Sequence, residues 1–166
     1  MRNKKLIMVV FLCLFYTVVQ SQGKENKIVI PLEEPTMLDP VKVSASIAST
    51  EDPTVKTLIF KVAILEGYHI YAYVSPQDPY IQSKIELELP EGITTLGKLQ
   101  TPIPTAYPGK GELYVYAGNI QFKQPIKIAA DYNNLTAIKC GLFYQTCNAN
   151  ICLPPTQKDV LLTLKN

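Results

Sequence analysis

The sequence predicts an all-β sandwich with antiparallel sheets, and three features indicate this fold. Apolar and polar residues alternate with a period of two over much of the chain, as they do in strands that bury one face. No stretch of twelve or more residues has a convincing helical period. Thirteen prolines separate the candidate strands, and short strands with turn signals between them favour a sandwich.

Residues 1–21 have the features of a secretory signal peptide. Three basic residues precede an apolar run at 6–19, and small residues follow up to Ser21, where signal peptidase could cleave. The run of about 14 residues is short for a membrane-spanning helix, which needs roughly 20, although an uncleaved anchor stays an alternative. We expect residues 22–27 to form a loose tail and residues 28–166 to form the sandwich domain.

The charge balance of the mature chain excludes two classes of partner. Cleavage after residue 21 removes three basic residues and leaves 13 basic residues against 14 acidic ones. A nearly neutral protein has no electrostatic reason to bind nucleic acid or an anionic membrane surface. Export would place the protein in the bacterial periplasm or outside the cell, where disulfides persist.

The candidate strands follow one another with few breaks. Residues 57–65, TLIFKVAIL, are apolar at almost every position and predict a strand that is buried on both faces. Residues 114–122, YVYAGNIQF, predict a hairpin whose turn is Ala117–Asn119. Four segments alternate apolar and polar residues and predict strands with one buried face: 41–48, 85–89, 125–130 and 159–165. Strands are also expected at 138–145 and 157–164, on either side of the cysteine pair.

Two segments are predicted to be irregular. Residues 74–80 form the first, and residues 94–111, which contain Pro102, Pro104 and Pro108, form the second. Proline cannot donate to a strand ladder, so these residues disfavour regular pairing. A long loop in a compact domain is more often functional or mobile than idle.

Three cysteines remain after cleavage: Cys140, Cys147 and Cys152. Three cysteines cannot all pair within one chain. Cys140 shares a predicted strand face with apolar neighbours, so we expect a buried free thiol, with a bridge to Cys147 or to another molecule as alternatives. The chemistry of the domain therefore depends on Cys147 and Cys152, which four residues separate.

This spacing allows a structural staple, a metal site or a redox pair. A ring of about six residues removes only about 2 kcal/mol of unfolded-chain entropy, so a staple would add little stability. A metal site lacks a second Cys or His pair, although Cys140 and the only histidine, His69, could complete one. A thioredoxin-type site has a shorter spacing and a helix that Pro154 and Pro155 would prevent. A local, exposed bridge between two strands is typical of labile disulfides, which tend to be catalytic or regulatory.

The residues around the pair resemble a known family. Tyr144-Gln145-Thr146-Cys147 and Cys152-Leu153-Pro154-Pro155 resemble the active-site signature of the N-terminal periplasmic domain of DsbD, the thiol:disulfide interchange protein. The segments 66–73, EGYHIYAY, and 107–116, YPGKGELYVY, resemble two further regions of that domain. The resemblance covers most of residues 40–166.

The resemblance implies an immunoglobulin-like sandwich in which Cys147 and Cys152 exchange disulfides without a cofactor or metal. It implies that Cys152 is the nucleophile toward the substrate and that Cys147 is the resolving thiol. A thioredoxin-fold domain or a membrane-embedded thiol reductase would donate electrons. Periplasmic disulfide proteins would accept them, in a reductant pathway of the cytochrome c maturation type.

The resemblance also implies which residues surround the pair. Residues 94–111 match a cap loop, and Tyr107 matches the aromatic residue that covers the cysteines. His69 and Tyr71 match two flanking aromatic positions: the first could stabilise a thiolate, and the second could donate a hydrogen bond to sulfur, with plain packing as the alternative for both. Tyr144 and Pro154 of the signature are expected to complete the surroundings.

The sequence departs from the family in three ways. The spacer between the cysteines has four residues where the best-known members have five, and Thr105 and Ala106 stand where those members carry acidic residues. An acid–base role of those carboxylates therefore does not transfer. Because the family's membrane and thioredoxin domains are not in this sequence, the reductant is expected to be a separate protein. Two other classes stay open: an interaction module with a structural bridge, and a metal-binding module.

Overall fold

The computed structural model describes residues 32–129 and 137–164. The predicted signal peptide (1–21) and loose tail (22–27) lie outside the described residues. Within them there are eleven strands and no helix, and so no helix that is long and apolar enough to span a membrane. The strands are β1 (Val41–Ser49), β2 (Val55–Ile64), β3 (His69–Tyr73), β4 (Lys84–Glu88), β5 (Ile93–Thr95), β6 (Thr105–Ala106), β7 (Tyr114–Tyr116), β8 (Asn119–Ile128), β9 (Ala137–Tyr144), β10 (Thr146–Cys147) and β11 (Thr156–Thr163).

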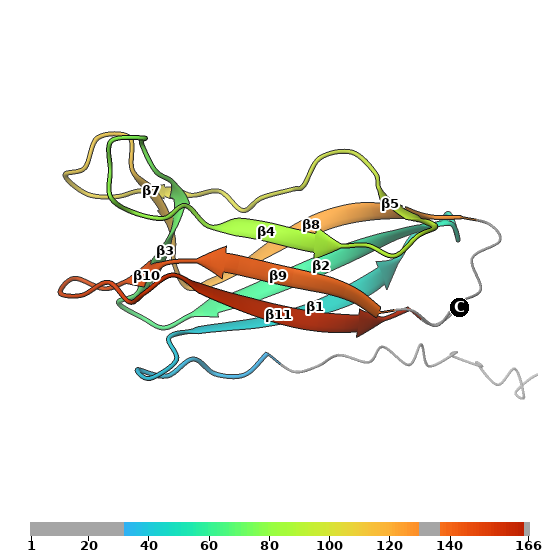
Figure 1. Cartoon of the computed structure of the whole chain (residues 1–166), viewed down its shortest axis with the longest axis horizontal. Helices are drawn as coiled ribbons and strands as arrows, with labels where there is room; N and C mark the ends of the chain where they lie inside the picture. Colours follow the sequence, from blue (N-terminus) through green and yellow to red (C-terminus); the bar gives the residue numbers. More distant parts are fainter. Residues whose placement is uncertain (1–31, 130–136, 165–166) are drawn as a thin grey trace, which may run out of the picture.

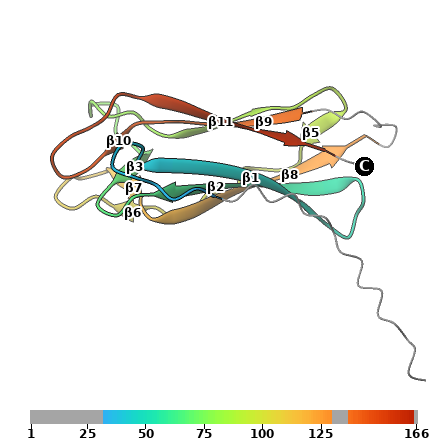
Figure 2. The ribbon, with the colours of Figure 1, turned by 90° about the horizontal axis from the view of Figure 1, so that it is seen from below.

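The strands form two facing layers and a small third sheet. One layer has the order β1-β2-β8-β5 and the other has the order β11-β9-β4, and Figure 2 shows the two layers edge on. The small sheet, with the order β10-β3-β7-β6, lies at one end of the sandwich (Figure 1). Neighbouring strands in all three sheets pair antiparallel. The predicted all-β, immunoglobulin-like antiparallel sandwich is therefore confirmed.

The main core lies between the two layers. The predicted alternation places apolar residues inward in β1, β4 and β9, and the glutamates of β4 are exposed. Burial of such residues removes apolar surface from water and is the main contribution to folding. The largest fully buried side chains of this core are Val41, Val62, Ile70, Ile126, Ile138 and Leu142.

The prediction that residues 57–65 are buried on both faces is wrong for most of the strand. Leu58 and Phe60 are buried in β2, but Ile59 is half-buried and Lys61 is exposed. Only residues 62–64 are buried in succession. Apolar composition alone does not separate a fully buried strand from one that carries a few apolar residues on its outer face.

The predicted hairpin at residues 114–122 is also wrong, because β7 and β8 belong to different sheets. Strand β7 pairs with β3 and β6, while β8 pairs with β2 and β5. Gly118 has a φ of 66°, and its carbonyl oxygen accepts a hydrogen bond from the Ile64 amide at 3.0 Å. Glycine adopts this left-handed conformation without strain. The bend therefore carries the chain from the small sheet into the layer of β2.

The segments that frame the cysteines lie close to their predicted positions. Strands β9 and β11 begin and end one residue before the predicted ranges 138–145 and 157–164, and they pair antiparallel along their whole length. Residues 94–111 are mostly irregular and include the end of β5, an isolated bridge between Gln100 and Lys123, and the two residues of β6. The connection between β9 and β11 projects from one end of the sandwich and contains β10 (Figure 1).

Candidate thiol–disulfide site

Cys147 and Cys152 form a disulfide across a tight turn. The Asn148 amide donates to the Ile151 carbonyl at 2.9 Å, and the Leu153 amide donates to the Thr146 carbonyl at 2.9 Å. These bonds lie on either side of the cysteines, which makes Cys147 and Cys152 a non-hydrogen-bonded antiparallel pair. Opposed residues are closest at such positions, and here the two Cα atoms are 4.0 Å apart. The four-residue spacer therefore brings the two sulfurs directly opposite each other.

Asn148 stabilises the turn that the spacer forms. Its side-chain oxygen Oδ1 accepts hydrogen bonds from the backbone amides of Asn150 and Ile151, each at 2.9 Å. An asparagine side chain that accepts hydrogen bonds from the backbone amides two and three residues later favours a turn at that point of the chain. The Asn-Ala-Asn-Ile spacer thus holds the cysteines together through local chemistry.

The two cysteines differ in exposure. Cys147 is 1% exposed, whereas Cys152 is an exposed residue near the end of the loop. Cys147 lies on β10, opposite His69 of β3, and it packs with Tyr71, Leu113 and Val115 in a cluster apart from the main core. A thiolate that attacks from solution can therefore reach the sulfur of Cys152 more readily than that of Cys147.

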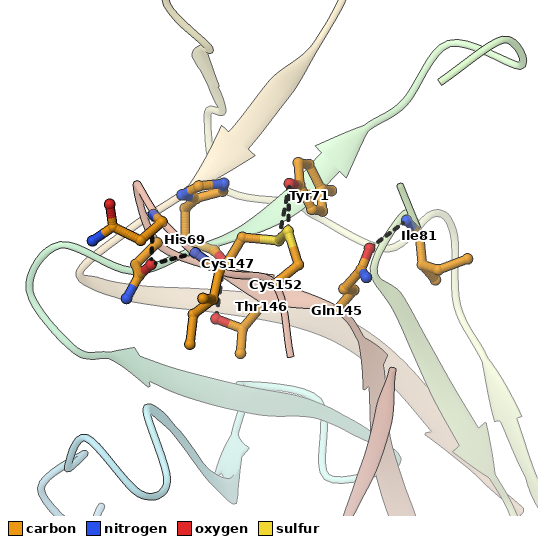
Figure 3. The surroundings of a disulfide bond; sticks show 10 residues. His69, Tyr71, Ile81, Gln145, Thr146, Cys147 and Cys152 are labelled. Carbon is orange, nitrogen blue, oxygen red and sulfur yellow. Dashed lines mark hydrogen bonds between the residues drawn. A yellow bond between two sulfur atoms is a disulfide. The ribbon is translucent and has the colours of Figure 1, made fainter. Parts of the chain in front are cut away.

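An aromatic cluster, formed by His69, Tyr71, Tyr80 and Tyr107, contacts the disulfide through Tyr71. Its hydroxyl donates a hydrogen bond to Cys147 Sγ at 3.1 Å, and its oxygen lies 3.9 Å from Cys152 Sγ (Figure 3). Burial, together with the neighbouring Tyr80 and Tyr107, raises the pKa of Tyr71 to about 12. The phenol is therefore protonated near neutral pH and acts as a donor. A bond from this donor would strengthen if the sulfur became a thiolate, because hydrogen bonds to charged groups are the stronger ones.

His69 is buried within the aromatic cluster. Its ring meets Tyr71 edge-on at a centroid distance of 5.3 Å and lies 5.0 Å from the ring of Tyr107. Burial lowers the pKa of His69 below its usual value, which favours the neutral imidazole. Its buried Nε2 atom has no hydrogen-bond partner among the described residues. The imidazole therefore has one nitrogen that is free to form a hydrogen bond, on a strand that pairs with the strand of Cys147.

Tyr107, the predicted cap residue, lies on the loop that follows β6. It is half-buried and packs against the cluster that contains Cys147 and Tyr71. Its amide donates to the Leu113 carbonyl at 2.8 Å, just beyond the pairing of β6 with β7. The cap segment is therefore the end of a small hairpin, and the exposed residues of β6, Thr105 and Ala106, lie at its base.

The structure does not place Tyr144 in the cluster with Cys147. Tyr144 is 3% exposed and packs in the main core, where burial raises its pKa to about 12. Pro154 is exposed after Cys152, and its carbonyl oxygen accepts a hydrogen bond from the Thr156 hydroxyl at 3.1 Å.

Cys140 is a free thiol that is 1% exposed in the main core. On β9 it lies between Leu87 of β4 and Val160 of β11. Burial raises its pKa to about 11, which disfavours the reactive thiolate. Within residues 32–129 and 137–164, no group of three or more His, Cys, Asp or Glu side chains is arranged to hold a metal ion.

Two residues of the site were missed by the sequence analysis. Tyr80 stacks on Tyr71, and Gln145 accepts a hydrogen bond from the Ile81 amide. Tyr80 lies in a segment that was predicted only to be irregular, and Gln145 was part of the signature without a role. The Tyr-Gln-x-Cys pattern was the only signal that pointed to either of them.

An immunoglobulin-like sandwich with an accessible disulfide beside buried aromatic rings defines the class of this protein as a β-sandwich thiol–disulfide module. Residues 34–164 match the family described as "Thiol:disulfide interchange protein DsbD, N-terminal". The chain therefore belongs to the family of DsbD N-terminal domains. A comparison with curated protein sequences gives no match.

Solved structures match this chain at low sequence identity, and the one with a TM-score above 0.5 shares its fold. The N-terminal periplasmic domain of ScsB from Proteus mirabilis is 17% identical with a TM-score of 0.54, and the match covers 82% of this chain and 51% of that one. This chain thus spans about half the length of that ScsB structure. The reduced DsbD N-terminal domain from Neisseria meningitidis is 16% identical with a TM-score of 0.45, covering 75% of this chain and 86% of that one. A complex of the DsbD and PilB N-terminal domains from the same organism gives 16% identity and a TM-score of 0.42, covering 74% and 87%.

Proposed function

We propose that this domain is a periplasmic thiol:disulfide interchange module that receives electrons through Cys152 and passes them to client disulfides. The observation that carries the proposal is the asymmetry of the pair. Cys152 is exposed, while Cys147 is buried and accepts a hydrogen bond from Tyr71. Family membership supports the same chemistry.

In the reductive half-reaction, a donor thiolate attacks Cys152 Sγ. The bond between Cys152 and Cys147 breaks, and Cys147 leaves as a thiolate that accepts the hydrogen bond from Tyr71. The donor's second thiolate then attacks its own sulfur in the mixed disulfide and releases Cys152. Two electrons have passed to the domain, and the donor has become a disulfide.

In the second half-reaction, the Cys152 thiolate attacks a client disulfide and forms a mixed disulfide with one client sulfur. Cys147 then attacks Cys152 Sγ, which re-forms the internal bridge and releases the client as a dithiol. Cys152 is therefore the nucleophile and Cys147 the resolving thiol. No cofactor is needed, because the electrons move only between sulfur atoms.

The surrounding residues are proposed to control access and protonation. Tyr107 would act as the cap, because it packs against the cluster that holds Cys147. His69 lies opposite Cys147 and has a buried nitrogen without a hydrogen-bond partner among the described residues, which would suit it to stabilise a thiolate. Tyr144, at the end of β9 in the main core, and Pro154, two residues before β11, would support the cysteine hairpin from its two ends.

The partners follow from the family and from the predicted export signal. We propose a thioredoxin-fold domain, or a membrane-embedded thiol reductase that acts through one, as the donor, and periplasmic disulfide proteins as acceptors. A cleaved leader at residues 1–21 would place the domain in the same compartment. The alternative is an interaction module in which the bridge is only structural.

Cysteine variants test the proposal and its direction of attack. Reduced Cys147→Ser protein should accumulate a mixed disulfide through Cys152 when it meets an oxidised partner such as glutathione disulfide, because the resolving thiol is absent. Reduced Cys152→Ser protein should exchange very little, because its remaining thiol at this site is buried. Mass spectrometry of acid-quenched samples measures both. Full exchange activity in Cys152→Ser protein would reject the assignment of the nucleophile.

A further inference from the structure

Tyr80 holds the ring of Tyr71 from one side. The two rings stack with centroids 4.6 Å apart and an angle of 18° between their planes. Tyr80 is half-buried and packs on the cluster that contains Cys147. Its position depends on residues 74–81, the irregular segment that follows β3 (Figure 1).

Hydrogen bonds fasten this segment at two places. The Ile81 amide donates to Gln145 Oε1 at 3.1 Å, and Gln145 directly precedes the two residues of β10 (Figure 3). The Ser83 amide donates to the Tyr71 carbonyl at 2.8 Å, and Gln82 forms a parallel bridge with Tyr71. The segment and the two residues that follow it are thus joined to the strand of Tyr71 and to the residue that precedes the strand of Cys147.

This arrangement restricts the hydroxyl that bonds to sulfur. The Tyr71 oxygen lies 3.1 Å from Cys147 Sγ and 3.9 Å from Cys152 Sγ, so a small rotation of the ring would change both contacts. The hydrogen bonds found among the described residues do not join Tyr80 to either sulfur. An aromatic stack favours one ring orientation and contributes beyond the area that it buries. Tyr80 can therefore affect the sulfurs through the orientation of Tyr71.

We propose that Tyr80 is a positioning residue: its stack, fastened by Gln145, holds the Tyr71 hydroxyl on Cys147 Sγ. This inference rests on the proposed function, because the hydroxyl matters most when Cys147 leaves as a thiolate. It extends that function to a segment for which the sequence predicted no role. A preorganised donor needs no reorganisation as charge develops on the sulfur.

The test measures the second-order rate at which dithiothreitol reduces the oxidised mature domain near neutral pH. The variants are Tyr80→Leu, Tyr80→Phe, Gln145→Leu, Gln145→Glu, Tyr71→Phe and the double variant Tyr71→Phe/Tyr80→Leu. Tyr80→Phe keeps the ring stack and is the conservative control for Tyr80→Leu. Gln145→Glu keeps an acceptor for the Ile81 amide and is the conservative control for Gln145→Leu. Tyr73→Leu, at an exposed tyrosine that meets Tyr114, is a matched control outside the cluster. Circular dichroism checks that each variant is folded.

We expect Tyr80→Leu and Gln145→Leu to slow reduction by up to about tenfold, the factor for losing about 1.4 kcal/mol in the transition state. Tyr80→Phe and Gln145→Glu should stay close to the unmodified domain. In the double variant the Tyr80 change should add nothing to the Tyr71 change, because coupled residues are non-additive. Equal rates for Tyr80→Leu and Tyr80→Phe, or additive effects in the double variant, would overturn the positioning role.

The same measurements separate this inference from the proposed function. An unmodified domain that exchanges quickly, with rates that Tyr80→Leu leaves unchanged, would overturn the role of Tyr80 and keep the interchange function. An unmodified domain that dithiothreitol reduces as slowly as an inert structural bridge would overturn both. Gln145→Leu provides a second disruptive change if Tyr80→Leu fails to fold.

Discussion

The hydrogen bond from Tyr71 to Cys147 leads to a quantitative prediction for the Tyr71→Phe variant. Phenylalanine keeps the ring that packs against Tyr80 and His69 and removes only the hydroxyl. That hydroxyl lies 3.1 Å from Cys147 Sγ in a residue that is 2% exposed. The pKa of about 12 keeps the phenol protonated over the working range, so the variant removes a donor and no charge.

The size of the effect follows from the charge that Cys147 gains as it leaves. A hydrogen bond to a charged group contributes about 1.5–3 kcal/mol. Brønsted values of about 0.4–0.5 for the attacking thiol indicate a transition state in which roughly half of the charge has left the attacking sulfur. If the leaving sulfur gains at most about half of its final charge there, the barrier rises by up to roughly 0.7–1.5 kcal/mol. At about 1.36 kcal/mol for each factor of ten, reduction slows by up to about 3- to 12-fold.

Stopped-flow or quenched-flow reduction by dithiothreitol, with thiols counted by mass spectrometry, measures this rate. Tyr73→Phe is the control, because it removes the hydroxyl of an exposed tyrosine in the same strand. The melting temperature of each oxidised variant shows whether the fold is intact. An unchanged or faster rate in a folded Tyr71→Phe domain would refute the view that this hydroxyl stabilises the leaving thiolate.

Two further predictions concern Cys140 and His69. In the folded, reduced domain, iodoacetamide should modify Cys152 well before Cys140, whose pKa of about 11 leaves little thiolate, and Cys140 should react only after unfolding. Rapid labelling of Cys140 in the native state would contradict its burial. The Cys140→Ser variant should lose about 1–3 kcal/mol of stability in urea unfolding, because it buries a hydroxyl in an apolar core. Burial lowers the pKa of His69, so the unfolded chain binds more protons as the pH falls through about 6.5, and stability should decrease from about pH 7 to pH 5. His69→Phe should reduce this decrease, and an identical pH dependence of the urea midpoint in the variant would show that His69 does not cause it.

Much of the fold was predictable because the strands with one buried face leave a period of two in the sequence. Strands β1, β4 and β11 were found in this way. The predicted hairpin at 114–122 was wrong because two apolar segments joined by a glycine have the same sequence pattern in a hairpin as in a connection between two sheets. The partner of a strand depends on contacts that are distant in sequence, such as the bond from Ile64 to Gly118.

The cysteine pair was predictable from its own spacing and flanking residues, because the turn that closes it is local. The placement of Tyr71 and Tyr107 beside the pair was expected only through the family resemblance. Tyr80 could not be found in this way, since its contact with Tyr71 depends on how residues 74–81 fold back over β3. Tyr144 belongs to the same short signature as Cys147, yet it packs in the main core.

The central claim is that Cys147 and Cys152 form a working redox pair, and its most direct test is the equilibrium reduction potential of the mature domain. Equilibration against a glutathione or dithiothreitol series, with mass-spectrometric thiol counting, measures it, and Cys140 serves as the internal count of one constant thiol. We predict a value between about −180 and −270 mV, the range in which thioredoxin-fold oxidoreductases operate. A value well below about −300 mV would identify a structural disulfide and contradict the interchange function.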